Sequence, residues 1–116
     1  MNQIIAVTVG DIEGIGIEIL IKIFKSKKNN KFLLFINYKI FKSYLFKKKI
    51  NIKLNIVNNN LGRLQKLDFK KNINIYDFKS KTKIENTYRS LIESYQLTKM
   101  KYFIGILTLP INKEII

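Results

Sequence analysis

The 116-residue sequence contains no cysteine and no histidine, and it has only one proline, five glycines and two arginines. Without cysteine, the chain forms no disulfide, no thiolate zinc site and no thiol nucleophile. Without histidine, it has no imidazole to move protons near neutral pH or to bind a metal. These absences exclude thiol and imidazole chemistry from this chain.

Long apolar runs and export signals are also missing. No apolar stretch approaches the roughly 18 residues of a transmembrane helix. The N-terminus has neither the basic region nor the small-residue cleavage site of a signal peptide. We therefore expect a cytoplasmic protein with no membrane partner. A length of 116 residues and an apolar fraction of 47% predict a single domain with a real core.

Lysine is abundant, and the formal net charge is +14. That charge alone would predict a nucleic-acid or anionic-membrane partner. However, 20 of the 22 basic residues are lysine, and isoleucine and asparagine are also frequent, with 22 and 13 copies. All three have AT-rich codons, so an AT-rich genome under weak selection is the simplest explanation. Arginine, which reads phosphates and guanines with two donors, is nearly absent, and we expect no specific nucleic-acid binding.

The apolar pattern predicts five strands. Nearly continuous apolar runs, typical of strands buried on both faces, cover residues 4–9, 32–36 and 103–107. Alternating patterns, typical of half-exposed strands, cover residues 50–57 and 73–78.

Helical spacing of apolar residues predicts three helices, which begin at Ile17, span about 38–45 and span 84–101. The third has a capping box, Thr82 to Glu85. One face of it carries apolar side chains: Ile84, Tyr88, Leu91, Ile92 and Tyr95. The order β-α-β-α-β-β-α-β predicts an α/β sandwich with a mainly parallel sheet.

Three of the five glycines lie within seven residues, at Gly10, Gly14 and Gly16, between the first strand and the first helix. A strand that turns into a helix leaves unpaired backbone N–H groups at the helix start, where the dipole adds positive charge. Such a turn can hold a phosphate or carboxylate. The spacing is neither the dinucleotide fingerprint nor a P-loop. Glycines of a tight turn that lets the helix pack closely are the alternative interpretation.

A second loop, residues 108–113, follows the last predicted strand and contains the only proline. Because ligands of open α/β sheets bind at the carboxyl ends of the strands, we expect both loops to line one site. Residues 110–114 are predicted to begin a further helix, so the sequence reads as unfinished at residue 116.

Together the two loops resemble the signature of the 4-hydroxythreonine-4-phosphate dehydrogenases, the PdxA family of vitamin B6 biosynthesis. Residues 8–18 read T-x-G-D-x-x-G-I-G-x-E, where the family usually has T-x-G-D-P-A-G-I-G-P-E. Residues 108–114 read T-x-P-I-N-K-E, which matches a second family segment. The motifs have the family's order and about its separation. The resemblance spans the whole chain but only the N-terminal part of a family member, so we expect residues 1–116 to form one truncated α/β domain.

The resemblance implies an isocitrate/isopropylmalate-dehydrogenase-like fold and a homodimer. The family oxidises 4-phosphooxy-L-threonine with NAD(P), and the β-keto acid then loses carbon dioxide. A divalent metal held by histidines polarises the reacting oxygens. Those histidines and the family's G-H-T-E segment lie beyond residue 116. This chain is therefore expected to contain no catalytic residue and no metal ligand, and to be inactive alone.

The resemblance also implies site residues. The cofactor would contact five residues of the first motif: Gly10, Asp11, Gly14, Gly16 and Glu18. The phosphorylated amino-acid substrate would contact three residues of the second: Thr108, Asn112 and Lys113. For the two carboxylates, the alternative role is to favour the helix dipole. For Lys113 the alternative is a solvated surface position, and for Thr108 and Asn112 it is to shape the loop.

The first motif departs from the family pattern at three positions. The family's two prolines are replaced by Ile12 and Ile17, which loosens the turn. Its alanine is replaced by Glu13, which adds negative charge where an anion would approach. Two other hypotheses remain beside a dehydrogenase fragment or decayed remnant: a non-enzymatic phosphate- or anion-binding remnant, and a basic nucleic-acid-binding protein.

Overall fold

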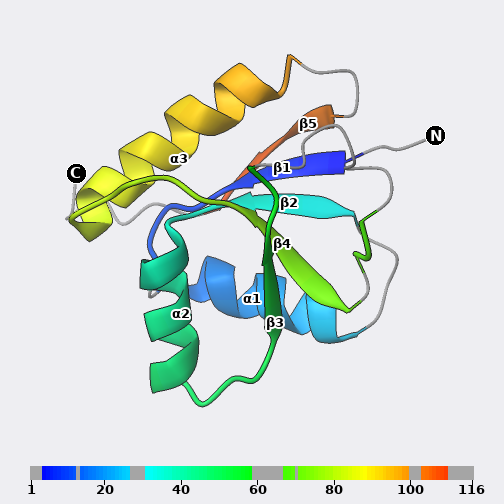
Figure 1. Ribbon diagram of the computed structural model, residues 1–116, viewed down its shortest axis with the longest axis vertical. Helices are drawn as coiled ribbons and strands as arrows, with labels where there is room; N and C mark the ends of the chain where they lie inside the picture. Colours follow the sequence, from blue (N-terminus) through cyan, green and yellow to red (C-terminus); the bar gives the residue numbers. More distant parts are fainter. Residues whose placement is uncertain are drawn as a thin grey trace.

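The computed structural model describes residues 4–12, 14–26, 31–58, 67–69, 71–99 and 103–109. Its elements follow the predicted order β-α-β-α-β-β-α-β (Figure 1). The strands are β1 (Ile4–Thr8), β2 (Phe32–Phe35), β3 (Lys53–Ile56), β4 (Asn72–Tyr76) and β5 (Phe103–Thr108). The helices are α1 (Ile15–Lys25), α2 (Tyr38–Lys47) and α3 (Lys83–Leu97). The helix predicted at residues 110–114 lies outside the described residues.

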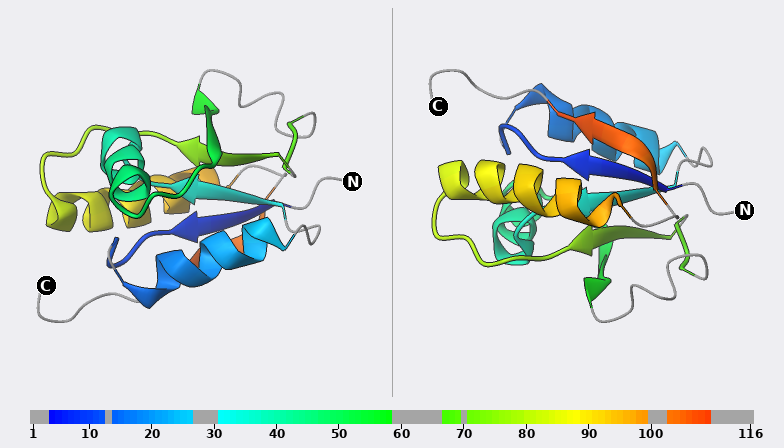
Figure 2. Two further views of the ribbon diagram at one scale, coloured as in Figure 1. Left: turned by 90° about the horizontal axis from the view of Figure 1, so that it is seen from below. Right: turned by 90° about the horizontal axis from the view of Figure 1, so that it is seen from above.

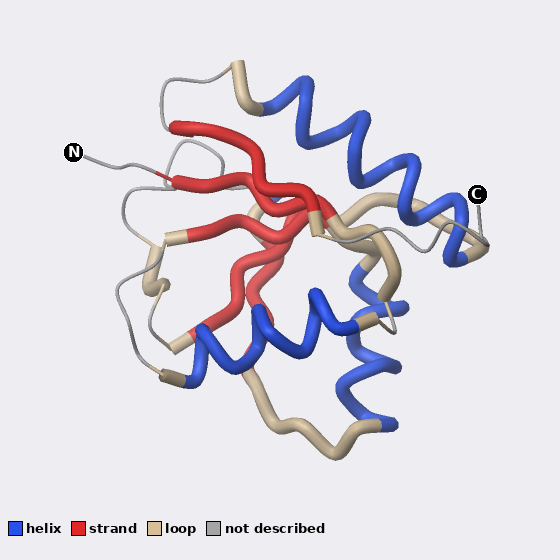
Figure 3. Tube along the Cα trace, turned by 180° about the vertical axis from the view of Figure 1, so that it is seen from behind, coloured by secondary structure: helices blue, strands red, loops and turns tan. Residues whose placement is uncertain are grey.

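The five strands form one sheet in the order β3-β4-β2-β1-β5, and every pairing is parallel. The predicted α/β class with a mainly parallel sheet is thereby confirmed. β1 occupies the position next to the β5 edge, so the first and last described strands are neighbours although about a hundred residues separate them in sequence. Because all five strands are parallel, their carboxyl ends lie at one edge of the sheet. Figure 3 shows the strands, in red, as one sheet with helices, in blue, beside it.

The helices form a layer on each face of the sheet (Figure 2). α1 and α2 pack on the face that carries Val7 and Leu34, in the larger hydrophobic cluster. The opposite face carries Ala6 and Leu33, in a second cluster on which the end of α3 packs. Because β1 and β2 are covered on both faces, their apolar side chains need not alternate with polar ones, which explains the continuous runs in the sequence.

α3 presents its polar face to the sheet and its apolar face outward. The buried residues of this helix are all small or amide-bearing: Asn86, Thr87, Ser90 and Ser94. Tyr95 of the predicted apolar face is 64% exposed and Ile92 is 51% exposed. The apolar spacing therefore predicted the helix correctly, but its apolar face is not the face that packs against the sheet. The reason lies in the hydrogen bonds that the polar face makes.

The polar face of α3 satisfies backbone groups at the ends of β1 and β2. The Ser90 hydroxyl accepts a hydrogen bond from the Val9 amide at 2.8 Å and donates to the Phe35 carbonyl at 2.6 Å. The Thr87 hydroxyl donates to the Gly10 carbonyl at 2.8 Å. Buried backbone groups without partners are costly, so the strand ends favour hydroxyl side chains at these positions.

The edge strand β5 adds further exposed apolar area. Ile104 is 59% exposed and Leu107 is 50% exposed, because in the described residues this strand pairs only with β1. Exposed apolar strand edges and helix faces promote association. We therefore predict poor solubility of the isolated chain as a monomer. No helix in the described part of the chain is long and apolar enough to cross a membrane.

We predict that Ser90→Ala lowers the free energy of unfolding by about 1–3 kcal/mol, because it leaves a buried amide and a buried carbonyl unpaired. Ile92→Ala, on the outward face of the same helix, is the matched control and should change stability by less than about 0.5 kcal/mol. Urea denaturation followed by circular dichroism measures both. A larger loss for Ile92→Ala than for Ser90→Ala would show that α3 packs by its apolar face.

Candidate functional site

The glycine turn links β1 to α1 by a close backbone approach. Gly14 is the N-cap of α1, with φ of −86° and ψ of 176°, and as a glycine it has no side chain that could cap the helix. The Gly14 amide donates to the Asp11 carbonyl at 3.0 Å. A Cβ at Gly14 would lie 3.2 Å from both the Cβ and the carbonyl oxygen of Asp11. Close packing within the turn, and not a left-handed backbone, therefore requires glycine at this position.

The five predicted cofactor residues lie within this turn and the first turn of α1. Gly10 and Gly16 are buried, Asp11 and Gly14 are half-buried, and Glu18 is exposed. Glu18 stands in the first turn, where a carboxylate is favoured by the helix dipole. The backbone N–H groups at the start of α1 are the groups that this turn offers to an anion. Contacts of these residues with a cofactor stay a prediction.

The loop after β5 leaves the sheet beside the glycine turn. Thr108 pairs in register with Thr8, and the Leu109 amide donates to the Thr8 carbonyl at 3.0 Å. Thr108 is exposed at the carboxyl end of its strand. The predicted common edge of the two motif loops is thus present. Asn112 and Lys113 lie outside the described residues.

A crevice lies between β2 and β4, two neighbouring strands that are followed by helices on opposite faces of the sheet. β2 leads into α2 on one face, whereas its neighbour β4 leads into α3 on the other. Ligands of open α/β sheets bind at such a switch point, outside the carboxyl ends of the strands. The sequence does not reveal the strand order, so it predicts a site only at the loops after β1 and β5 and not at this crevice.

A pocket of about 880 Å³ occupies the crevice, which we call the switch-point pocket. It is lined by residues of α2, of the loops after β2 and β4, and by one residue of the glycine turn: Ile12, Asn37, Tyr38, Lys39, Ile40, Ser43, Tyr44, Lys47, Lys48, Asp77, Phe78, Lys79, Ser80, Lys81, Thr82 and Lys83. The signal that could have pointed to it is a polar residue directly after a buried strand, at Asn37 and at Asp77.

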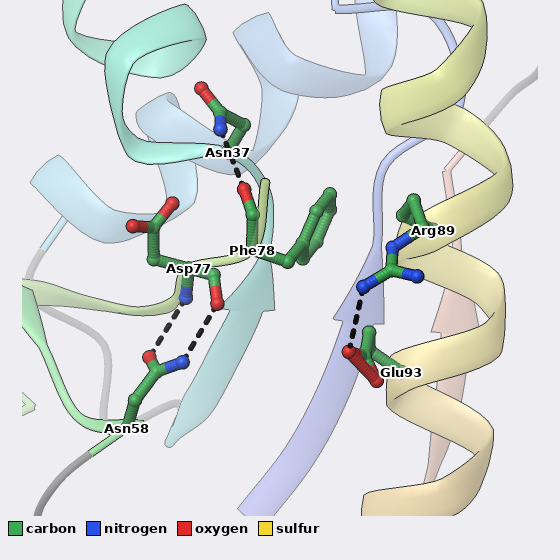
Figure 4. A network of polar contacts seen from close by, with 6 residues as sticks. All are labelled: Asn37, Asn58, Asp77, Phe78, Arg89 and Glu93. Atoms are coloured by element: carbon green, nitrogen blue, oxygen red, sulfur yellow. Dashed lines mark hydrogen bonds and ion pairs between the residues drawn. The ribbon is translucent and has the colours of Figure 1, made fainter. Parts of the chain in front are cut away.

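Asn37 links the two sides of the switch-point pocket (Figure 4). Its side-chain oxygen accepts from the Ile40 amide at 3.0 Å and so caps α2. Its side-chain nitrogen donates to the Phe78 carbonyl, 2.6 Å away in the loop after β4. Its own amide donates to the Asn86 side-chain oxygen of α3 at 2.8 Å. One buried residue therefore joins α2, the loop after β4 and α3, the first two through its side chain and the third through its backbone amide.

Asp77 and Asn58 fix the same loop from the side of β3 (Figure 4). The Asn58 amide nitrogen donates to the Asp77 carbonyl at 2.7 Å, and the Asp77 amide donates back to the Asn58 side-chain oxygen at 2.9 Å. An Asp77 carboxylate oxygen accepts from the Tyr38 amide at 2.7 Å. The walls of the pocket are thus held in place by hydrogen bonds within the chain.

Tyr76 is the last residue of β4 and lies at this edge of the sheet. Burial, and secondly the negative charge of Glu93, raise the pKa of Tyr76 above its ordinary value. Tyr76 therefore stays protonated well into the alkaline range and supplies no base near neutral pH. Glu93 also forms a 3.4 Å ion pair with Arg89 on the surface of α3, a kind of pair that contributes little stability.

The donor set does not fit the divalent metal that the family resemblance implies. The sequence has no histidine. No group of three or more potential metal-ligating side chains occurs among the residues that the structure describes. We therefore derive no chemical step through a metal held by this chain.

Comparisons with known proteins show similarity of structure. No protein-family model matches the sequence, and no curated protein matches it. A solved structure from Salmonella typhimurium, described as a candidate 4-hydroxythreonine-4-phosphate dehydrogenase, matches with a TM-score of 0.75 and 19% identity. The chain has the fold of part of that protein. The match covers 99% of this chain and 39% of that one, so the chain spans well under half the length of the neighbour. The similarity that the two motifs predicted is confirmed for the fold.

We predict that Gly14→Ala destabilises the chain by about 1–3 kcal/mol, because the new methyl group crowds the Asp11 backbone. Gly105→Ala in β5 is the control, since nothing lies within 4 Å of a Cβ built there. That change should be neutral or stabilising by up to about 1 kcal/mol. Thermal melts of both variants give the comparison, and equal Tm values would contradict a tight turn at Gly14.

Proposed function

We propose that this chain is the glycine-turn portion of an NAD(P)-dependent dehydrogenase that acts on 4-phosphooxy-L-threonine in vitamin B6 biosynthesis. The observation that carries the proposal is the register pairing of Thr8 with Thr108. It supports the proposal because the two segments that resemble the family signature begin side by side, at Thr8 and Thr108, at one edge of the sheet. The fold shared with a described dehydrogenase of this kind supports the same conclusion.

In this proposal the chain binds and orients ligands. The N–H groups at the start of α1 donate to a phosphate or carboxylate of the cofactor, and the close turn at Gly14 sets their direction. Thr108 and Asn112 shape and contact the substrate side of the site. Lys113 approaches the substrate phosphate as a point charge. Asp11 and Glu18 orient the turn or contact a cofactor ribose.

The oxidation itself requires groups that this chain does not provide. A bound nicotinamide cofactor would supply hydride-accepting chemistry, and a metal held by groups outside this chain would supply Lewis-acid chemistry. Metal-binding histidines would have to come from polypeptide outside residues 1–116, in a homodimeric assembly. We therefore propose that the isolated chain, a fragment or a decayed remnant of such an enzyme, binds ligand without turning it over.

A second candidate, a non-enzymatic phosphate-binding protein, uses the same turn. It is favoured by the start of α1, where the N-cap is a glycine and the first N–H groups of the helix point toward the turn. The two candidates differ in selectivity. An anion site at a helix start accepts inorganic phosphate, whereas the dehydrogenase site prefers the complete cofactor or substrate.

We predict that millimolar NAD⁺, NADP⁺ or 4-phosphooxy-L-threonine raises the Tm of the chain. At a ligand concentration ten times Kd the stabilisation is about 1.4 kcal/mol, or several degrees for a domain of this size. Absorbance should show no reduction of NAD⁺ in the presence of substrate and Mg²⁺. Gly14→Ala should reduce the Tm shift, and Gly105→Ala should leave it unchanged.

Two outcomes of this experiment separate the alternatives, and the coding sequence gives a further check. A shift by inorganic phosphate equal to that by the organic ligands would favour the non-enzymatic anion site. No shift with any of them would contradict both candidates. The coding sequence that follows codon 116 provides an independent check, since the dehydrogenase proposal requires a G-H-T-E segment and metal-ligand histidines there, in frame or after a frameshift.

A further inference from the structure

The switch-point pocket is lined by an unusual concentration of one charge. Six of its sixteen lining residues are lysine, whereas lysine makes up 20 of the 116 residues of the chain. The lining contains a single carboxylate, Asp77, whose oxygen already accepts from the Tyr38 amide. A general excess of lysine explains a basic surface, but the pocket has about twice the lysine fraction of the whole sequence.

The lining lysines belong to two segments of the chain, which we call the lysine banks, and we call the buried apolar and aromatic lining residues the floor. One bank is on and directly after α2, at Lys39, Lys47 and Lys48, and the other is on the connection from β4 to the start of α3, at Lys79, Lys81 and Lys83. All six are exposed. The floor includes apolar and aromatic side chains with low exposure: Ile12 at 3%, Tyr44 at 6% and Phe78 at 7%.

We propose that the switch-point pocket binds a nucleoside polyphosphate. The aromatic and apolar floor suits a flat ring system, since aromatic side chains bind bases by packing and stacking. The two lysine banks suit the multiple negative charges of a di- or triphosphate, which each ammonium group contacts as a point charge. A volume of about 880 Å³ lies within the range that encloses ligands of this size.

The hydrogen bonds around the pocket favour binding because they fix its walls in advance. Asn37 ties the start of α2 to the Phe78 carbonyl, and the Asn58–Asp77 pair ties the loop after β4 to the end of β3. Loops that are already ordered lose less entropy when the ligand arrives. A polyphosphate also relieves repulsion among six like charges, so affinity should fall as salt rises.

This inference does not depend on the proposed dehydrogenase. The pocket lies at the ends of β2 and β4, whereas the two motif loops follow β1 and β5. Only Ile12 of the glycine turn contributes to its lining. The two proposals use different residues, so a failure of either one leaves the other standing.

The test is isothermal titration of the 116-residue chain with ADP, adenosine and inorganic pyrophosphate at low salt. We expect ADP to bind at least tenfold more tightly than either partial ligand, because it alone uses both the floor and the lysine banks. The double variant Lys79→Ala/Lys81→Ala should weaken ADP binding tenfold or more. The control Lys22→Ala/Lys25→Ala removes the same charge from the exposed side of α1 and should change the affinity less than twofold.

A blocking variant tests the location. Ser43→Trp places a large ring on an exposed position of α2 that lines the pocket, and it should abolish ADP binding while circular dichroism and Tm stay near those of the parent. Equal weakening by the two lysine double variants would overturn the proposal in favour of diffuse attraction. Pyrophosphate binding as tight as that of ADP would show that the floor is not used. The proposal would also be overturned if a single-stranded oligonucleotide bound more tightly than ADP and Ser43→Trp did not reduce that affinity. The lysines would then form a nucleic-acid-binding surface.

Discussion

The arrangement of this protein depends on the hydrogen bonds between the polar face of α3 and the ends of β1 and β2. Ser90 bridges Val9 and Phe35, and Thr87 holds Gly10. Small hydroxyl side chains allow a close approach of helix and sheet, and they satisfy strand-end groups that would otherwise be buried unpaired. The polar face of α3 positions both candidate sites. Ser90 and Thr87 bind the Val9 amide and the Gly10 carbonyl, where the glycine turn begins. Asn86 of the same face accepts from the Asn37 amide at the switch-point pocket.

Local periodicity was sufficient to predict the order and class of the elements. The runs that became β1 and β2 are continuous because both faces of the sheet are covered, and the capping box at Thr82 marks the start of α3, where its hydroxyl accepts from the Glu85 amide at 3.0 Å. The packed face of α3 could not be predicted from the same pattern. A helical period states which residues share a face, but the choice between faces here is decided by distant backbone groups that need partners.

The two candidate sites differ in the same way: one could be predicted from local sequence and the other could not. The glycine turn was predictable because its three glycines, the preceding strand and the following helix are contiguous in sequence. The switch-point pocket was not, since it depends on β2 and β4 being neighbours whose helices take opposite faces. Asn37 and Asp77 each follow a buried strand, yet only the strand order shows that they belong to one pocket. The described starts of the two motif loops lie together at the carboxyl edge of the sheet, while the histidines that the resemblance implies as metal ligands are absent from the sequence.

The most direct test of the central role of α3 is native-state hydrogen exchange of the Val9 and Asn37 amides, followed by NMR. Both donate to side chains of α3, at 2.8 Å in each case. If α3 fixes the two strand ends, these amides exchange only when the whole domain opens, with the same free energy as the central residues of β1 and β2. Exchange as fast as that of exposed loop amides, while the β1 and β2 amides remain protected, would contradict this account.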